Sequence, residues 1–209
     1  MNKKEKFVIT INRELGSGGH TVGQKLAEKL NVGFYDKMLI RGLTEKFNLS
    51  VEEVEKMKGR SHSWWSELLN HFSVGQGMVP TGQIPAKLDV PTTEEIFKVE
   101  TEILKGIAEK TSCIITGRSG FFVFRNEPNH LSVLIQASMP HRIERVMRKQ
   151  NMTEDEARKT IEKIDKMREN YVQKYTKTSR YDTRNYDLVI SADNKTEDEI
   201  VELIMQYIG

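Results

Sequence analysis

The fold is set by residues 7–30, FVITINRELGSGGHTVGQKLAEKL. The β-rich run Phe7–Ile11 predicts a strand, a loop with Gly16, Gly18 and Gly19 follows, and apolar positions at helical spacing predict a helix from His20. A glycine turn between strand and helix aims backbone N–H groups and the helix N-terminus at one point, which suits a phosphate. The stretch therefore predicts an anion site, the alternative being a tight turn without a ligand. Its loop lacks the lysine of the standard phosphate-binding loop.

The chain has 209 residues and a formal net charge of +2, with 30% charged residues. This length suits one domain, residues 1–209, and the balanced charge argues against a nucleic-acid partner. No apolar run suits a signal peptide or a membrane span, so we expect a cytoplasmic protein without a membrane partner. The single cysteine, Cys113, opens an apolar run, which predicts a buried, unreactive thiol rather than a nucleophile.

Strand and helix patterns alternate along the chain. Strands are predicted over five short runs: Phe7–Ile11, Gly33–Tyr35, Cys113–Thr116, Leu131–Ala137 and Asp187–Ser191. Helices are predicted near His20–Leu30, Lys37–Phe47, Thr93–Lys110, Pro140–Lys149, Glu154–Tyr175 and Thr196–Ile208. The alternation predicts an α/β fold, in which helices cover both faces of a parallel sheet and ligands bind beyond the C-terminal strand ends.

Residues 59–92 interrupt this pattern with prolines and glycines. A long loop of this composition in a compact domain is commonly functional or mobile. Trp64 and Trp65 lie within it. They act either as an aromatic anchor or dimer contact, or as a wall beside a bound base.

Polar residues follow the predicted strands, where a ligand would bind. Asp36 either caps the next helix or faces a metal-bound or hydroxyl-bearing substrate. Arg41 lies near the start of that helix, where a guanidinium can reach a phosphate. Arg118 stands between Gly117 and Ser119 after the third strand, so the backbone can approach a ligand while the guanidinium binds an anion.

The helix predicted near Pro140–Lys149 carries a row of basic residues. Arg142, Arg145 and Lys149 share one face of it at i, i+3 and i+7 spacing. This row is either a solvated helix face or a lid that neutralises phosphate charge.

The long helix after it opens with a capping box made of Thr153 and Glu156. Its apolar stripe is interrupted by Arg168, and Asp165 lies three residues earlier, within pairing distance on a helix. A charge in a buried seam needs a partner. That partner is either Asp165 alone or a bound phosphate.

Together these residues resemble the cytidylate kinase-like family, within the P-loop nucleoside monophosphate kinases. The resemblance runs from about Phe7 to the C-terminus and is clearest in four segments: Ile9–Leu30, Phe34–Lys37, Ile115–Arg118 and Asp165–Arg168. It implies a three-layer P-loop NTPase-type fold with a five-stranded parallel sheet, a nucleotide-binding insert over about 38–92 and a lid region over about 139–180. It also implies ATP- and Mg²⁺-dependent phosphoryl transfer to a nucleoside monophosphate such as CMP, or to another small acceptor.

The resemblance also implies roles for single residues. The phosphate loop would comprise Gly16, Ser17, Gly18, Gly19, His20 and Thr21, with the Thr21 hydroxyl near Mg²⁺. Asp36, Arg41 and Arg118 would lie on the acceptor side. The catalytic charges would come from Arg13, Arg118, Arg142, Arg145, Asp165 and Arg168.

Two departures from the family pattern stand in these motifs. Gly19 takes the position of the phosphate-loop lysine, so the cation must come from elsewhere, with Arg13 as the first candidate and His20 as a weaker one. Ser119 stands where the family has an aspartate, which bears on cytosine recognition. Two functions follow: an ATP-dependent kinase, or a nucleotide- or phosphate-binding regulatory module without chemistry. A dinucleotide-dependent oxidoreductase is disfavoured, because the glycine spacing departs from GxGxxG.

Overall fold

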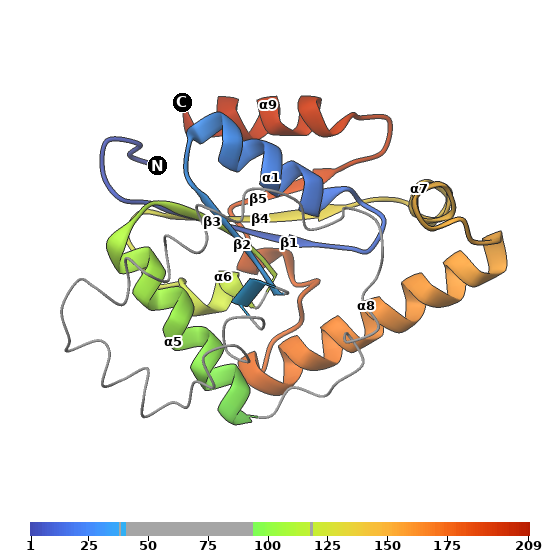
Figure 1. The fold of residues 1–209 in the computed structure, drawn as a ribbon, viewed down its shortest axis with the longest axis horizontal. Coiled ribbons are helices and arrows are strands. Elements are labelled where there is room, and N and C mark those ends of the chain that lie inside the picture. Colours follow the sequence, from blue (N-terminus) through green and yellow to red (C-terminus); the bar gives the residue numbers. More distant parts are fainter. Residues whose placement is uncertain (38, 41–93, 118) are drawn as a thin grey trace.

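The computed structural model describes residues 1–37, 39–40, 94–117 and 119–209. A five-stranded parallel sheet forms its centre, in the order β2-β3-β1-β4-β5 (Figure 1). The strands are β1 (Val8–Arg13), β2 (Gly33–Asp36), β3 (Cys113–Thr116), β4 (His130–Gln136) and β5 (Leu188–Ser191). The predicted parallel sheet is confirmed, with each strand close to its predicted run.

The end of β1 differs from the sequence-based expectation. The strand continues past Ile11 because its pairing with β4 extends two residues further than its pairing with β3. Its ladder with β3 ends where Ile11 lies opposite Thr116, whereas its ladder with β4 continues until Arg13 lies opposite Ile135. The backbone of Arg13 is therefore fixed by the sheet, directly before the glycine loop.

Helices cover both faces of the sheet. They are α1 (Gly19–Leu30), α5 (Glu94–Lys110), α6 (Gly120–Val123), α7 (Met139–Gln150), α8 (Glu154–Thr176) and α9 (Glu197–Ile208), with a short 3₁₀ helix at Thr183–Asn185. Figure 1 shows α1 and α9 on one face and α5 and α6 on the other, with both chain termini on the side of α1 and α9. The predicted helices are confirmed where they are described; most of the one predicted over Lys37–Phe47 lies outside the described residues.

Two apolar layers flank the sheet and supply the main burial energy. One joins α1 and α9 to the sheet through residues such as Ile9, Leu26 and Ile204. The other joins α5 to the sheet and includes Cys113, whose side chain is fully buried as predicted. Within the described ranges, no helix is long and apolar enough to cross a bilayer.

A third, smaller apolar cluster packs α7 against α8. α8 begins with the predicted capping box, in which Thr153 accepts from the Glu156 amide and the Glu156 carboxylate accepts from Thr153. Because its N-terminus is capped and its apolar side is packed on α7, α8 presents Asp165 and Arg168 from a rigid element.

Candidate functional site

The glycine loop turns through two left-handed positions, Gly16 (φ 87°) and Gly18 (φ 81°). Gly18 is the N-cap of α1 and provides no side-chain cap, so the first-turn N–H groups of α1 are left for another acceptor. Thr21 lies in the first turn of α1, which begins at Gly19. A loop of this geometry suits a phosphate group.

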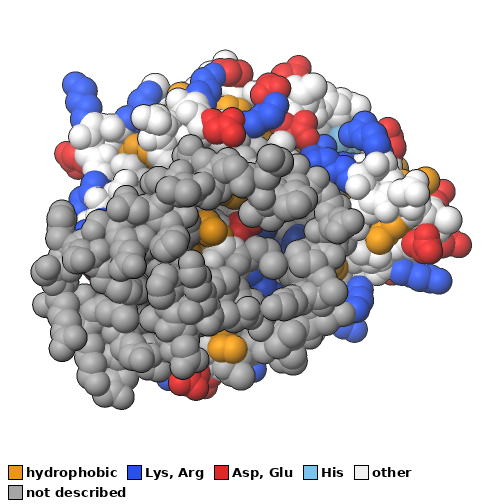
Figure 2. All heavy atoms as spheres, in the orientation of Figure 1, with side chains coloured by type: hydrophobic (Ala, Val, Ile, Leu, Met, Phe, Trp, Pro, Cys, Tyr) orange, Lys and Arg blue, Asp and Glu red, His pale blue; other side chains and the backbone are white. Residues whose placement is uncertain are grey.

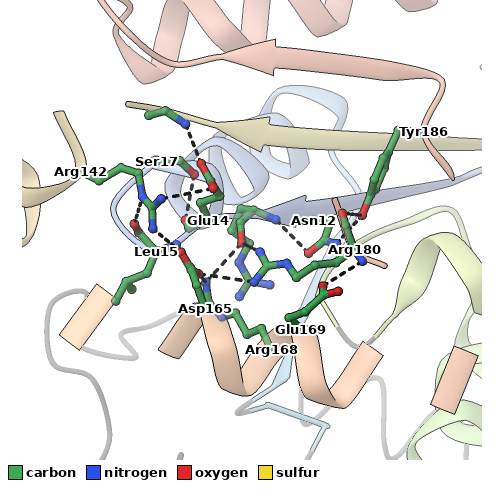
Figure 3. A network of polar contacts seen from close by, with 12 residues as sticks. Asn12, Glu14, Leu15, Ser17, Arg142, Asp165, Arg168, Glu169, Arg180 and Tyr186 are labelled. Atoms are coloured by element: carbon green, nitrogen blue, oxygen red, sulfur yellow. Dashed lines mark hydrogen bonds and ion pairs between the residues drawn. The ribbon is translucent and has the colours of Figure 1, made fainter. Parts of the chain in front are cut away.

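Arg142 and Asp165 clamp this loop from α7 and α8 (Figure 3). Asp165 Oδ1 accepts from the Leu15 amide at 3.1 Å, while Arg142 Nε donates to the Leu15 carbonyl at 2.9 Å. Arg142 also pairs with Asp165 and, at 3.2 Å, with Glu14. A Cβ at Gly16 would lie 2.7 Å from the Arg142 carbonyl oxygen, so only glycine fits the loop against α7. We call Glu14, Arg142 and Asp165 the loop clamp.

Of the two alternatives for the basic row on α7, the solvated helix face does not hold for Arg142, whose side chain is only 7% exposed. Arg145 is also largely buried and pairs with Glu197 of α9 at 2.5 Å. Its guanidinium carbon would lie 3.4 Å from a Cβ at Gly18, so Arg145 packs against the loop itself. Two of the three basic residues therefore face the glycine loop rather than solvent. Elsewhere on the face seen in Figure 2, acidic and basic side chains intermingle around α1 and α9.

Arg13 lies where a side chain from position 19 would go. A Cβ at Gly19 would lie 2.6 Å from Arg13 Cβ and 3.2 Å from its Cγ. The guanidinium then reaches the turn after β3, where it closely approaches Gly117, a left-handed glycine with φ 80°. Arg13 thus connects the glycine loop with the segment that follows β3.

Three arginines converge at the C-terminal end of β1, and we call Arg13, Arg168 and Arg180 the arginine cluster. Figure 3 labels Arg168 and Arg180. Arg168 and Arg180 both donate to the Arg13 carbonyl, Arg168 at 3.2 Å. The predicted Asp165–Arg168 pair is present at 3.5 Å, and Arg180 lies 3.4 Å from the same carboxylate oxygen. Burial and the charges of Arg13 and Arg180 lower the pKa of Arg168 to about 9. The cluster is therefore a focus of positive charge beside the loop.

Asp36 faces α1 from the end of β2. Its Oδ2 lies 2.9 Å from His20 Nε2, and its Oδ1 accepts from the Leu39 amide at 2.9 Å, the i to i+3 bond of a helix cap. Burial alone would raise the pKa of Asp36, but the His20 and Leu39 hydrogen bonds and the charges of His20 and Arg13 together lower it. The His20 ring also packs edge-on against Phe34. His20 is thus occupied by Asp36 in this arrangement.

Two serines among the predicted residues are buried in the structure. Ser17 is buried and donates from its amide and hydroxyl to the Glu14 carbonyl, which closes the loop on itself. Ser119 is buried at φ 54°, and its hydroxyl has no hydrogen-bond partner among the described residues. Arg41, Arg118, Trp64 and Trp65, with nearly all of the insert predicted over 38–92, lie outside the described residues.

Sequence reasoning missed two residues of the candidate site, Glu14 of the loop clamp and Arg180 of the arginine cluster. Arg180 stands in a polar segment, Thr178-Ser179-Arg180-Tyr181, and belongs to no recognisable motif. A charged residue shortly before the buried strand β5 is a weak signal by itself. In the described part of the chain, no group of three His, Cys, Asp or Glu side chains is arranged to hold a metal ion.

Solved structures share this fold. An uncharacterised protein from Eubacterium ventriosum superposes with a TM-score of 0.70 at 25% identity, covering 97% of this chain and 98% of that one. A shikimate kinase from Bacteroides thetaiotaomicron superposes with a TM-score of 0.51 at 17% identity, again over 97% and 98%. The second likeness concerns the fold alone and supports a P-loop kinase-type architecture.

Two curated proteins have similar sequences. A cytidylate kinase from Sulfolobus acidocaldarius is 22% identical over 96% of this chain and 93% of its own length. An S-adenosylmethionine-dependent nucleotide dehydratase from Lacinutrix mariniflava is 26% identical over 97% of this chain, which spans only 36% of that protein. The model of the cytidylate kinase-like family matches residues 8–194. The chain therefore belongs to the cytidylate kinase-like family.

Proposed function

We propose that the protein is a nucleotide kinase-like phosphotransferase that uses ATP and Mg²⁺ to phosphorylate a nucleoside monophosphate, CMP-like, or another small acceptor. The observation that carries the proposal is the position of Arg13. Its side chain fills the space beside Gly19, where the lysine of a standard phosphate loop would start. From there the side chain extends to the turn after β3, where its guanidinium lies against Gly117 and would supply the positive charge that the loop otherwise lacks.

The residues present suit a bound triphosphate. The first-turn N–H groups of α1 have no side-chain cap, and Arg145 packs against the loop at Gly18. ATP would supply the transferable phosphoryl group, and Mg²⁺ would neutralise part of its charge. Mg²⁺ would be held by phosphate oxygens and the Thr21 hydroxyl.

The chain's own residues then act by positioning and by charge. Arg13 and Arg168 would bind phosphate oxygens and stabilise charge that develops during transfer. The loop clamp keeps the loop in its binding conformation through Leu15, so the loop amides need not reorganise when a phosphate binds. Asp36, at the end of β2, would lie on the acceptor side, with its carboxylate held by His20 and the Leu39 amide.

A nucleotide substrate is favoured by the relatives. One is named a cytidylate kinase and the other a nucleotide dehydratase, so both names refer to nucleotides. The second name also refers to a reaction other than phosphoryl transfer, although this chain spans only 36% of that protein. CMP is therefore the first acceptor to test, with the other nucleoside monophosphates beside it.

A second candidate function is a nucleotide-binding regulatory module without catalysis. It is favoured by Gly19 in place of the lysine and by Ser119 in place of the family's aspartate. The discriminating experiment incubates the protein with ATP, Mg²⁺ and each nucleoside monophosphate, measures diphosphate formation, and measures ATP binding calorimetrically. Turnover with any acceptor rejects the module, whereas binding without turnover rejects the kinase.

Replacing Arg13 tests directly whether its side chain substitutes for the missing lysine. We expect Arg13→Met to lower kcat/KM for ATP about 100-fold, because a phosphate-facing cation is lost. Arg13→Lys should retain more activity. The control is Arg158→Met, which removes one guanidinium from the exposed side of α8, where it pairs with Glu154. Equal rates for Arg13→Met and the control would show that Arg13 does not replace the lysine.

A further inference from the structure

Arg180 is a fully buried arginine in the segment between α8 and β5, with 0% of its side chain exposed. Its Nη2 donates to the Arg13 carbonyl, and its Nη1 lies 3.4 Å from Asp165 Oδ1. Its Nε is buried and has no hydrogen-bond partner among the described residues. The guanidinium carbon also lies 5.1 Å from the centre of the Tyr181 ring.

The main chain of Arg180 is held from two directions. Its amide donates to Glu169 Oε2 of α8 at 3.1 Å. Its carbonyl accepts from the Tyr186 hydroxyl at 2.7 Å, and that hydroxyl accepts in turn from Asn12 of β1. Side chain and main chain are thus both tied to the elements that carry the site, as Figure 3 shows.

Burial of this guanidinium lowers the free energy of unfolding, so stability alone does not explain it. Burying a guanidinium with an unpaired Nε–H beside two other arginines is unfavourable, and an apolar side chain of similar length would fill the same space without that penalty. The guanidinium provides directional hydrogen bonds, which an apolar side chain cannot provide. Arg168 and Arg180 converge on one carbonyl, that of Arg13, and so fix the peptide group at which β1 passes into the loop.

We propose that Arg180 is a positioning residue: it holds the Arg13 main chain and Asp165, and through them orients the Arg13 guanidinium and the phosphate loop. This inference rests on the proposed function for its catalytic consequence. Arg180 acts through Arg13 and the loop rather than on the nucleotide. Its loss should therefore affect the donor nucleotide more than the acceptor.

The experiment compares Arg180→Met and Arg180→Lys with Arg184→Met. Arg184 is a matched control, because it lies four residues further on, is 88% exposed and pairs with Asp182 at 2.7 Å. Hydrogen exchange of the Leu15 and Ser17 amides reports on the loop, with the β4 amides as an internal reference. Steady-state kinetics give kcat and KM for ATP and for the acceptor separately.

For Arg180→Met we expect loop exchange about 10-fold faster with β4 unchanged, and kcat/KM for ATP about 10-fold lower with the acceptor KM unchanged. Arg180→Lys should lie between wild type and Arg180→Met, because a lysine can donate to one acceptor but not to two in a fixed fork. Arg184→Met should match wild type in all readouts.

Unchanged loop exchange and kinetics in Arg180→Met, with only a lower melting temperature, would overturn the proposal in favour of a filling role. If Arg180→Met does not fold, Arg180→Lys decides by the same comparison. The exchange measurement needs no turnover. Absence of diphosphate formation in the wild type therefore contradicts the proposed function, whereas unchanged loop exchange contradicts the role of Arg180.

Discussion

Gly19 stands where a phosphate-loop lysine is expected, and the space beside it holds Arg13. Restoring the lysine by Gly19→Lys should therefore fail. The new Cβ would meet Arg13 Cβ at 2.6 Å, so Arg13 must move, and overpacking of this kind costs about 1–3 kcal/mol. We expect a lower free energy of unfolding and no gain in ATP affinity, measured by urea denaturation and calorimetry.

Gln24→Lys is the control for this prediction, since it adds the same charge to the half-exposed part of α1 without entering the loop. A Gly19→Lys variant that binds ATP more tightly than wild type would show that Arg13 is not fixed in this place. Sequence reasoning could name Arg13 as a substitute because it lies six residues from Gly19. It could not name Arg180, because the contact between Arg180 and the Arg13 carbonyl depends on how the segment after α8 folds back.

At the scale of the elements, α8 is joined to the glycine loop by Asp165. One carboxylate accepts from the Leu15 amide and faces Arg142 and Arg180. Asp165→Asn would remove the carboxylate that faces the buried Arg180 guanidinium and would leave Arg142 with Glu14 alone. Breaking a buried ion pair in this way costs about 3–5 kcal/mol. We expect the urea midpoint to fall accordingly, together with ATP affinity.

The matched control is Glu162→Gln, which removes a carboxylate from the exposed side of the same helix. Its free energy of unfolding should stay within about 0.5 kcal/mol of wild type. Equal stability of the two variants would mean that Asp165 does not hold the loop.

The elements themselves were largely predictable because their signals are local. Alternating strand and helix patterns placed all five strands, and Thr153 with Glu156 marked the start of α8. The burial of Arg142 was not predictable in this way. Helical spacing shows which residues share a face. It cannot show that Glu14 and Asp165, which come from other elements, pair with Arg142 on that face.

At the scale of the whole molecule, the sheet lies between two apolar layers, and β3 and β1 carry the candidate site at their C-terminal ends. Site and core therefore share the same strands. Disturbance of the loop clamp acts at the end of a strand, whereas exposure of the middle of β3 requires the layer beneath α5 to open.

The rate at which a thiol reagent modifies Cys113 reports on that opening. Its thiol is fully buried at the start of β3, and burial raises its pKa to about 12. At pH 8, a thiol reagent should modify native Cys113 at least about 10³-fold more slowly than the unfolded chain, because reaction requires opening of the sheet. A Glu127→Cys reporter in a Cys113→Ala background, exposed in the turn before β4, should react at the unprotected rate. If Cys113 reacted as fast as this reporter, β3 would open locally in the native protein. It would then not be the rigid strand that holds Gly117 against Arg13.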